Sequence, residues 1–144
     1  MPSWKLVITA LLVIAISRSI MAEEEDEEDD WELKIEVLKK VDDCKYRSRK
    51  GDTLTWHYTG KLKDGTVFDS SVGRDPYWAT LGRGQIIQGV DEGMLDMCEG
   101  EVRRLTVPAH LGYGERGYPG SIPPNAVLIF ENELLKIDRG NDEL

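Results

Sequence analysis

Side chains that commonly carry out acid–base or nucleophilic chemistry are sparse in this sequence. The two histidines, His57 and His110, stand apart, and neither lies beside a nucleophile motif. Zinc-ligand spacing, a phosphate-binding loop and a dinucleotide glycine motif are also missing from the sequence. We therefore expect a protein that uses neither a metal nor an organic cofactor.

The remaining candidates are aromatic residues, one carboxylate and a loop over 110–125 that is rich in glycine and proline. Such a set suits a site that binds an apolar group without acid–base or covalent chemistry. Long loops inside compact domains are often functional, and the turns that glycine and proline impose would give this one a defined shape. Judged on residue types alone, however, the same aromatics favour a plain hydrophobic core.

The stretch 54–71 shows how some of these residues could meet. Apolar residues alternate with polar ones from Leu54 to Leu62, which predicts a half-buried strand. Asp64-Gly65 is a hairpin signal, because glycine tolerates the positive φ of such turns. A second strand over 66–69 would then place Phe68 and Asp69 near Tyr58.

Similar alternation predicts three more strands, over 31–37, 102–107 and 126–137. In the first strand, the residues expected to face inward are Trp31, Leu33, Ile35 and Val37. In the last strand, Asn132 interrupts an otherwise apolar inward face. The segment 72–77 is predicted to be a loop or a bulged edge.

One short helix is predicted between these strands. Apolar residues recur at helical spacing over 87–97, and Gly100 is expected to end the helix as a C-cap. About five antiparallel strands with one helix make an α+β domain, in which the helix covers one face of the sheet.

The sequence has only two cysteines, Cys44 and Cys98, so one intramolecular pairing is possible. The C-x-x-C motif of redox proteins is absent. We therefore predict a structural disulfide rather than two free thiols. In the chain-entropy model, closing a loop of this length stabilises the fold by about 4 kcal/mol.

The two ends of the chain predict its compartment. Residues 1–22 contain Lys5, then an apolar run too short to span a membrane, and finally Ala22. This pattern indicates a signal peptide that is cleaved near Ala22. A retained membrane anchor is the alternative. The last four residues, Asn141 to Leu144, differ at one position from an endoplasmic-reticulum retrieval signal. We expect the mature protein to lie in the endoplasmic reticulum lumen, with no membrane span.

The net charge of −9 comes mainly from an acidic block at 23–30, which predicts a disordered arm. Weak calcium buffering by this arm is an alternative, although no EF-hand loop is present. The remainder of the chain is close to neutral, and nothing in its charge favours nucleic acid.

Several motifs together resemble one family, the FKBP-type peptidyl-prolyl cis/trans isomerases. The motifs occur in the family's order between Val37 and Ile137: His-Tyr-Thr-Gly (57–60), Asp-Gly-x-x-Phe-Asp-Ser-Ser (64–71), Gly-Tyr-Gly (112–114), Ile-Pro-Pro-Asn-Ala (122–126) and Leu-Ile-Phe-Glu-Asn-Glu-Leu-Leu (128–135). The cysteines and both chain ends resemble the family's endoplasmic-reticulum branch. The resemblance implies an antiparallel half-barrel of five to six strands wrapped around one short helix, over 31–138, followed by a tail over 139–144.

The resemblance also implies a proline pocket between sheet and helix. Its catalytic residues would be Tyr58, Phe68, Asp69, Tyr113 and Phe130. Its other ligand-binding residues would be Tyr77, Gln85, Ile86, Ile87, Val90, Tyr118 and Ile122. Val90 lies where the family usually has a tryptophan floor, so the ring would be held less tightly, by roughly 1–2 kcal/mol on area grounds.

The expected function is therefore isomerisation of X-Pro bonds during the folding of secretory proteins. Proline-containing polypeptides would be the clients, immunosuppressant macrolides possible inhibitors, and the retrieval receptor a partner of the tail. The alternative is an endoplasmic-reticulum module that holds proline-containing clients with little or no catalysis.

Overall fold

The computed structural model describes residues 31–140. The predicted signal peptide, acidic arm and retrieval tail all lie outside these residues. Among the described residues, those from Leu33 onward form one compact unit. In the described part of the chain, no helix has the length and apolar character that a membrane span requires.

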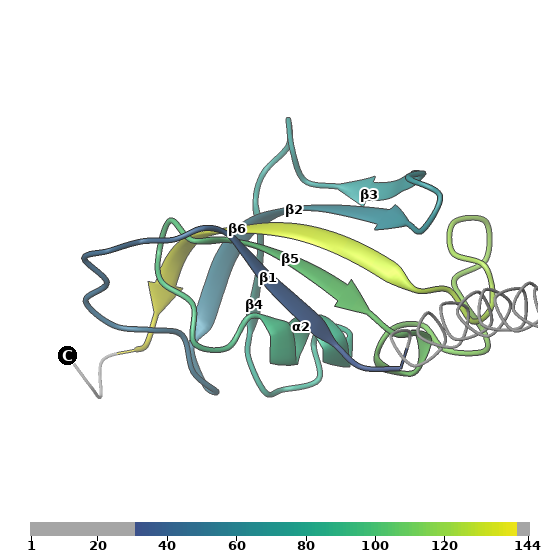
Figure 1. Cartoon of the computed structure of the whole chain (residues 1–144). Helices are drawn as coiled ribbons and strands as arrows, with labels where there is room; N and C mark the ends of the chain where they lie inside the picture. The colour runs from purple at the N-terminus through teal and green to yellow at the C-terminus, as the bar shows by residue number, and fades with distance from the viewer. Residues whose placement is uncertain (1–30, 141–144) are drawn as a thin grey trace, which may run out of the picture. The chain divides into compact units, whose positions relative to one another are not determined.

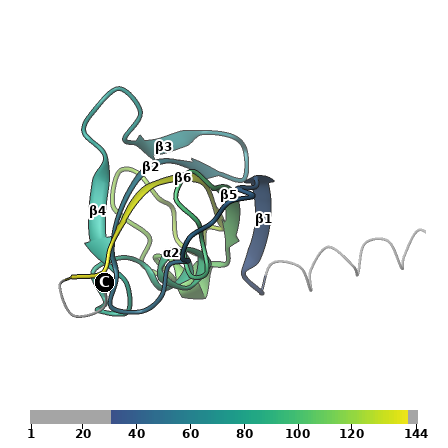
Figure 2. The same ribbon diagram turned by 90° about the vertical axis from the view of Figure 1, so that its left-hand side faces the viewer.

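Six antiparallel strands form one curved sheet in the order β1-β5-β6-β2-β3, with β4 paired to the other end of β2. The elements are β1 (Lys34–Lys39), β2 (Thr53–Leu62), β3 (Val67–Ser70), β4 (Tyr77–Thr80), α2 (Gln88–Gly93), β5 (Val102–Val107), η1 (Ala109–Leu111) and β6 (Leu128–Asp138). The sheet arches over α2 (Figures 1 and 2), and the predicted α+β class is confirmed.

The long strand β2 organises the sheet because it pairs with three others. It runs along β6 from Thr53 to Leu62, while β4 pairs with its first half and β3 with its second. The predicted alternation holds, since Leu54 and Trp56 are buried. Gly65, at φ 91°, closes the predicted hairpin to β3.

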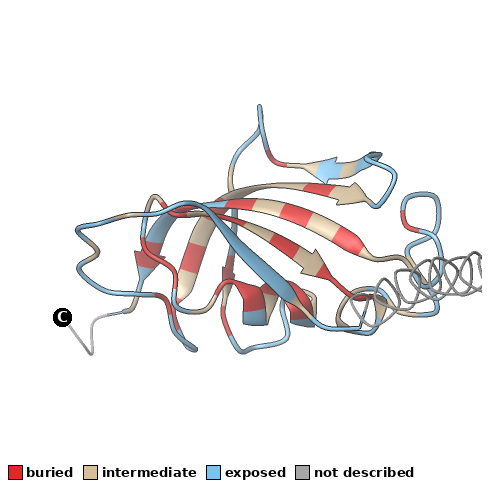
Figure 3. Cartoon of the chain, in the orientation of Figure 1, coloured by how far each residue is buried: buried red, intermediate tan, exposed pale blue. Residues whose placement is uncertain are grey.

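Burial is different on β1, where the prediction was wrong. The strand begins at Lys34, and all six of its residues are exposed (Figure 3). Trp31, Ile35 and Val37 are exposed, and Leu33 is only partly buried. The strand pairs with β5 alone, so it is an edge strand.

The helix is shorter than its sequence pattern. It ends at Gly93, so Gly100 is not its C-cap, although Gly100 does adopt a positive φ in a later turn. Two glycines let the helix approach β5 closely. A Cβ on Gly89 would lie 2.3 Å from Val107, and one on Gly93 would lie 2.6 Å from Leu105.

The side chain of a buried arginine donates hydrogen bonds to the backbone carbonyls at the end of this helix and just after it. The guanidinium of Arg103, on β5, donates to the carbonyls of Gly93, Leu95 and Asp96. Its charge is paired with the buried Glu101 at 2.5 Å. A cation at a helix C-terminus is favourable because it opposes the negative end of the helix dipole.

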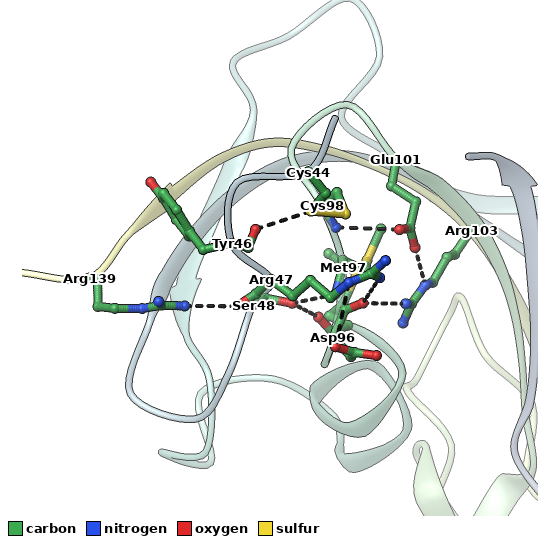
Figure 4. Close-up of a disulfide and its surroundings, with 11 residues drawn as sticks. Cys44, Tyr46, Arg47, Ser48, Asp96, Met97, Cys98, Glu101, Arg103 and Arg139 are labelled. Carbon is green, nitrogen blue, oxygen red and sulfur yellow. Dashed lines mark hydrogen bonds and ion pairs between the residues drawn. A yellow bond between two sulfur atoms is a disulfide. The ribbon is translucent and has the colours of Figure 1, made fainter. Parts of the chain in front are cut away.

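The predicted disulfide between Cys44 and Cys98 is confirmed (Figure 4). It ties the segment after β1 to the segment after α2. Beyond it, Ser48 Oγ donates to the carbonyl of Met94 at 2.6 Å and accepts the N–H of Met97 at 2.8 Å. The bridge and these hydrogen bonds fix the segment that follows the helix to the segment that follows β1.

Candidate functional site

A cavity of about 480 Å³ opens between the sheet and the segment that enters α2. The structure places ten of the twelve predicted pocket residues around it: Tyr58, Phe68, Asp69, Tyr77, Gln85, Ile86, Ile87, Val90, Tyr113 and Phe130. Tyr118 and Ile122 do not line it. The cavity therefore gathers residues from four strands, the helix and the loop over 110–125.

Three aromatic rings from different strands form one wall. Phe68 packs edge to face against Phe130, with ring centroids 5.6 Å apart, and Phe130 lies 6.5 Å from Tyr58. Gly60, on β2, makes this packing possible. A Cβ at that position would lie 2.5 Å from the Phe68 ring and 3.0 Å from the Phe130 ring.

Tyr77, at the start of β4, extends the wall. It meets Trp56 edge to face at 5.1 Å and Tyr58 at 6.1 Å. The sequence predicted no strand here, but pairing of Trp56 with Tyr77 starts β4. The neighbouring Trp78 is exposed and does not line the cavity.

Asp69 is the carboxylate at the cavity edge. It accepts a hydrogen bond from the Tyr58 hydroxyl at 2.5 Å and pairs with Arg74 at 3.0 Å. Burial, together with the hydrogen bond to Asp69 and its negative charge, raises the pKa of Tyr58 to about 12. Tyr58 is therefore a hydrogen-bond donor at neutral pH and not a base.

The rim comes from the glycine-rich loop. Tyr113 packs against Tyr118 with centroids 5.9 Å apart, and Ile122 is buried in the core. Burial and the negative charge of Asp69 raise the pKa of Tyr113. A turn fixes the shape of this rim, because Tyr118 and Ile122 form an isolated β-bridge. Gly117 lies close to the backbone of Ile122 within this turn, and a Cβ on Gly117 would lie 2.3 Å from the Ile122 carbonyl oxygen.

The remaining side of the cavity is the segment that enters the helix. The Gln85 side chain accepts the N–H of Thr80 at 2.8 Å, which fixes this segment to the end of β4. Ile86 and Ile87 follow it and are half-buried. Val90, in the first turn of α2, is buried and contributes to both the cavity and the core.

Three lining residues were not predicted as site residues: Trp56, Gly84 and Asn132. Trp56 shares the strand parity of Tyr58, which was a usable signal. Asn132 was noticed only as a polar residue on an apolar face. Glycine contributes backbone alone, so nothing in the sequence marked Gly84.

The cavity is thus an apolar recess with hydroxyl donors and one carboxylate at its edge. It can hold a small ring within an extended peptide, and its groups are suited to binding and not to proton transfer. The half-barrel sheet, the single helix and this recess together define a prolyl isomerase domain.

Comparison with known proteins agrees with this classification. The family described as FKBP-type peptidyl-prolyl cis-trans isomerase matches residues 44–135. "Peptidyl-prolyl cis-trans isomerase FKBP2" of Homo sapiens is 53% identical over 138 residues, covering 95% of each chain. "FK506-binding protein 2" of Yarrowia lipolytica is 48% identical over 135 residues, covering 92% of this chain and 94% of the relative. The chain belongs to the FKBP-type peptidyl-prolyl cis-trans isomerases.

Proposed function

We propose that the cavity binds the proline ring of an X-Pro segment and isomerises its imide bond during the folding of secretory proteins. The observation that carries this proposal is the recess itself, in which three aromatic rings and Val90 surround space for a small apolar ring. The tyrosine hydroxyls and the Asp69 carboxylate lie at its edge, where the peptide on either side of the ring would pass.

The reaction needs no acid or base. Amide rotation faces a barrier of about 18–20 kcal/mol because resonance keeps the bond planar. At X-Pro the two planar forms are close in energy but exchange in tens to hundreds of seconds. A catalyst must only bind the twisted imide better than either planar form.

Each wall of the cavity has a part in this scheme. Tyr58, Phe68 and Phe130 grip the ring while the preceding residue rotates. The twisted imide is less polarised than the planar one, so apolar surroundings favour it. The Tyr113 hydroxyl donates to a carbonyl of the bound chain, and the backbone of Ile86 and Ile87 meets that chain on the other side.

The residue roles are tested with a matched pair of variants on β3. Phe68→Ala removes one ring of the aromatic wall, whereas Val67→Ala trims an exposed side chain next to it. We expect Phe68→Ala to lower kcat/KM on an X-Pro peptide by about tenfold or more, since losing a partly buried phenyl ring costs over 1 kcal/mol. Val67→Ala should leave kcat/KM unchanged. Equal effects of the two substitutions would contradict the proposed role of Phe68.

We further propose that the protein acts in the endoplasmic reticulum lumen, reached through a signal peptide over 1–22 and kept there by Asn141 to Leu144. The sequence of both ends supports this proposal. Deleting residues 141–144 should send the protein into the culture medium of secreting cells. Retention of the truncated chain would contradict the role of the tail.

Binding of immunosuppressant macrolides is a related proposal, supported by the relatives named FK506-binding protein 2. FK506 should compete with X-Pro peptides for the cavity. Val90→Trp should raise the affinity for FK506, because an indole at the cavity floor adds apolar contact area. An unchanged or lower affinity would mean that Val90 is not the floor on which the ring rests.

A further inference from the structure

Asn132 is the most deeply buried residue of the cavity lining, with 0% of its surface exposed. The next most buried are Trp56 at 2%, Val90 at 5% and Phe130 at 7%, and we call these four residues the cavity floor. Three of them are apolar. Asn132 therefore brings the one carboxamide into an otherwise apolar floor.

This carboxamide is unsatisfied. Neither Oδ1 nor Nδ2 of Asn132 has a hydrogen-bond partner among residues 31–140. A buried polar group without a partner destabilises a fold, and most buried polar groups are paired. Asn132 thus carries a donor and an acceptor without protein partners at a position where an apolar side chain would avoid that cost.

The neighbours on the adjacent strands do not satisfy it. The sheet register sets Tyr58 of β2 and Arg103 of β5 opposite Asn132. The Tyr58 hydroxyl donates to Asp69, and the Arg103 guanidinium bonds Glu101 and the carbonyls that follow α2. Both polar side chains on this face are therefore committed elsewhere.

We propose that Asn132 is a specificity residue that selects a proline ring carrying a hydroxyl group at C4, that is, 4-hydroxyproline. The proposal rests on the proposed function, since it assumes that the cavity holds the ring. The imide nitrogen and Cα join the ring to the peptide chain at the cavity edge. C4 is the only ring atom two bonds from both of them, so a C4 substituent points to the floor.

The chemistry of the floor favours a neutral hydroxyl. A hydroxyl group both donates and accepts, which matches the carboxamide oxygen and nitrogen. A charged substituent would be desolvated against Trp56, Val90 and Phe130 without a counter-charge. The amide is covered in the empty cavity, so the ring hydroxyl would reach it only after the Asn132 side chain changes its χ1 rotamer and turns toward the cavity.

The test compares two peptides that differ only in proline against (4R)-hydroxyproline at the isomerised bond, with the (4S) epimer as a third. The full-length mature protein should show a kcat/KM for one hydroxyprolyl epimer about five- to tenfold above that for the prolyl peptide, each normalised to its spontaneous rate. Asn132→Val should abolish this preference. Glu133→Val, on the next residue and the opposite face of β6, should retain it.

A purely structural Asn132 would change stability but not the ratio between substrates or between epimers. Equal normalised rates for all three peptides would overturn the inference. This is also the result expected if a buried water molecule satisfies the Asn132 amide. If prolyl peptides are accelerated without the preference, the inference fails while the proposed function stands. If no peptide is accelerated, the proposed function fails, and the same ratio is then read from dissociation constants measured by NMR titration.

Discussion

Gly60→Ala is the substitution that most directly perturbs the aromatic wall. The added methyl group would lie 2.5 Å from the Phe68 ring and 3.0 Å from the Phe130 ring. The Phe68 ring must move, because real Cβ atoms are not found so close to a neighbour, and the Phe130 ring must give by a few tenths of an ångström. Overpacking of this kind costs about 1–3 kcal/mol, and replacing glycine within a strand returns about 0.5–1 kcal/mol.

The net expectation is a loss of about 0–2.5 kcal/mol in the free energy of unfolding. Because the displaced rings line the cavity, we also expect kcat/KM on an X-Pro peptide to fall by about tenfold. Urea denaturation measures the first quantity, and an isomerisation assay measures the second.

Gly93→Ala is the matched control. Its added methyl group would lie 2.6 Å from Leu105, a core residue that does not line the cavity. The control should lose stability but keep kcat/KM. Full activity of Gly60→Ala would contradict the role of the aromatic wall. So would a loss of activity in both variants in proportion to their loss of stability.

Three further predictions concern pH and stability. Activity should vary by less than about twofold between pH 6 and 9. The reason is that burial raises the pKa of Tyr58 to about 12 and also raises the pKa of Tyr113. A bell-shaped pH profile would instead reveal a catalytic acid–base group. Asp52 is buried, which opposes its ionisation, but hydrogen bonds and the charge of Arg139 lower its pKa. Its carboxylate therefore stabilises the fold above about pH 4, so Asp52→Asn should cost about 1–3 kcal/mol at pH 7. That deficit should shrink as the pH falls through the lowered pKa, and a deficit independent of pH would contradict the assignment. Cys44→Ser should cost about 2–4 kcal/mol of stability but keep kcat/KM, because the disulfide does not line the cavity; loss of activity in the folded variant would contradict this.

Local sequence patterns predicted the central part of the fold. The strand over 102–107 begins and ends where expected, and the hairpin at Asp64-Gly65 brings Phe68 and Asp69 to Tyr58. These features depend on alternation and turn chemistry, which act between residues close in the chain. The disulfide followed from there being only two cysteines.

The predictions were wrong where tertiary contacts determine burial or the end of an element. Alternation on β1 marks one face of a strand as apolar but does not reveal whether anything covers that face, and on this edge strand nothing in the described residues buries it. Met94 and Met97 continue a helical spacing beyond Gly93, yet they are buried for another reason. Long-range bonds from Ser48 and Arg103 hold that segment in place, and no local pattern encodes them.

The residues of the candidate site also fall into those that the sequence predicted and those that only the structure revealed. The five predicted catalytic residues lie in short motifs that the family resemblance identified, and the structure brings them around one cavity: Tyr58, Phe68, Asp69, Tyr113 and Phe130. Trp56 and Asn132 belong to the cavity floor only because the sheet curves over α2, which a strand pattern cannot show. The sequence did mark Asn132 as a polar residue on an inward strand face, but only the structure shows that this residue lines the cavity.

One measurement distinguishes catalysis of X-Pro isomerisation in this cavity from mere binding of proline-containing chains. NMR exchange spectroscopy on one sample of residues 23–144 with an X-Pro peptide measures both binding and the cis–trans exchange rate. We predict exchange well above the spontaneous rate, and its loss when FK506 fills the cavity. Peptide binding with exchange at the spontaneous rate would contradict the claim and leave a binding module.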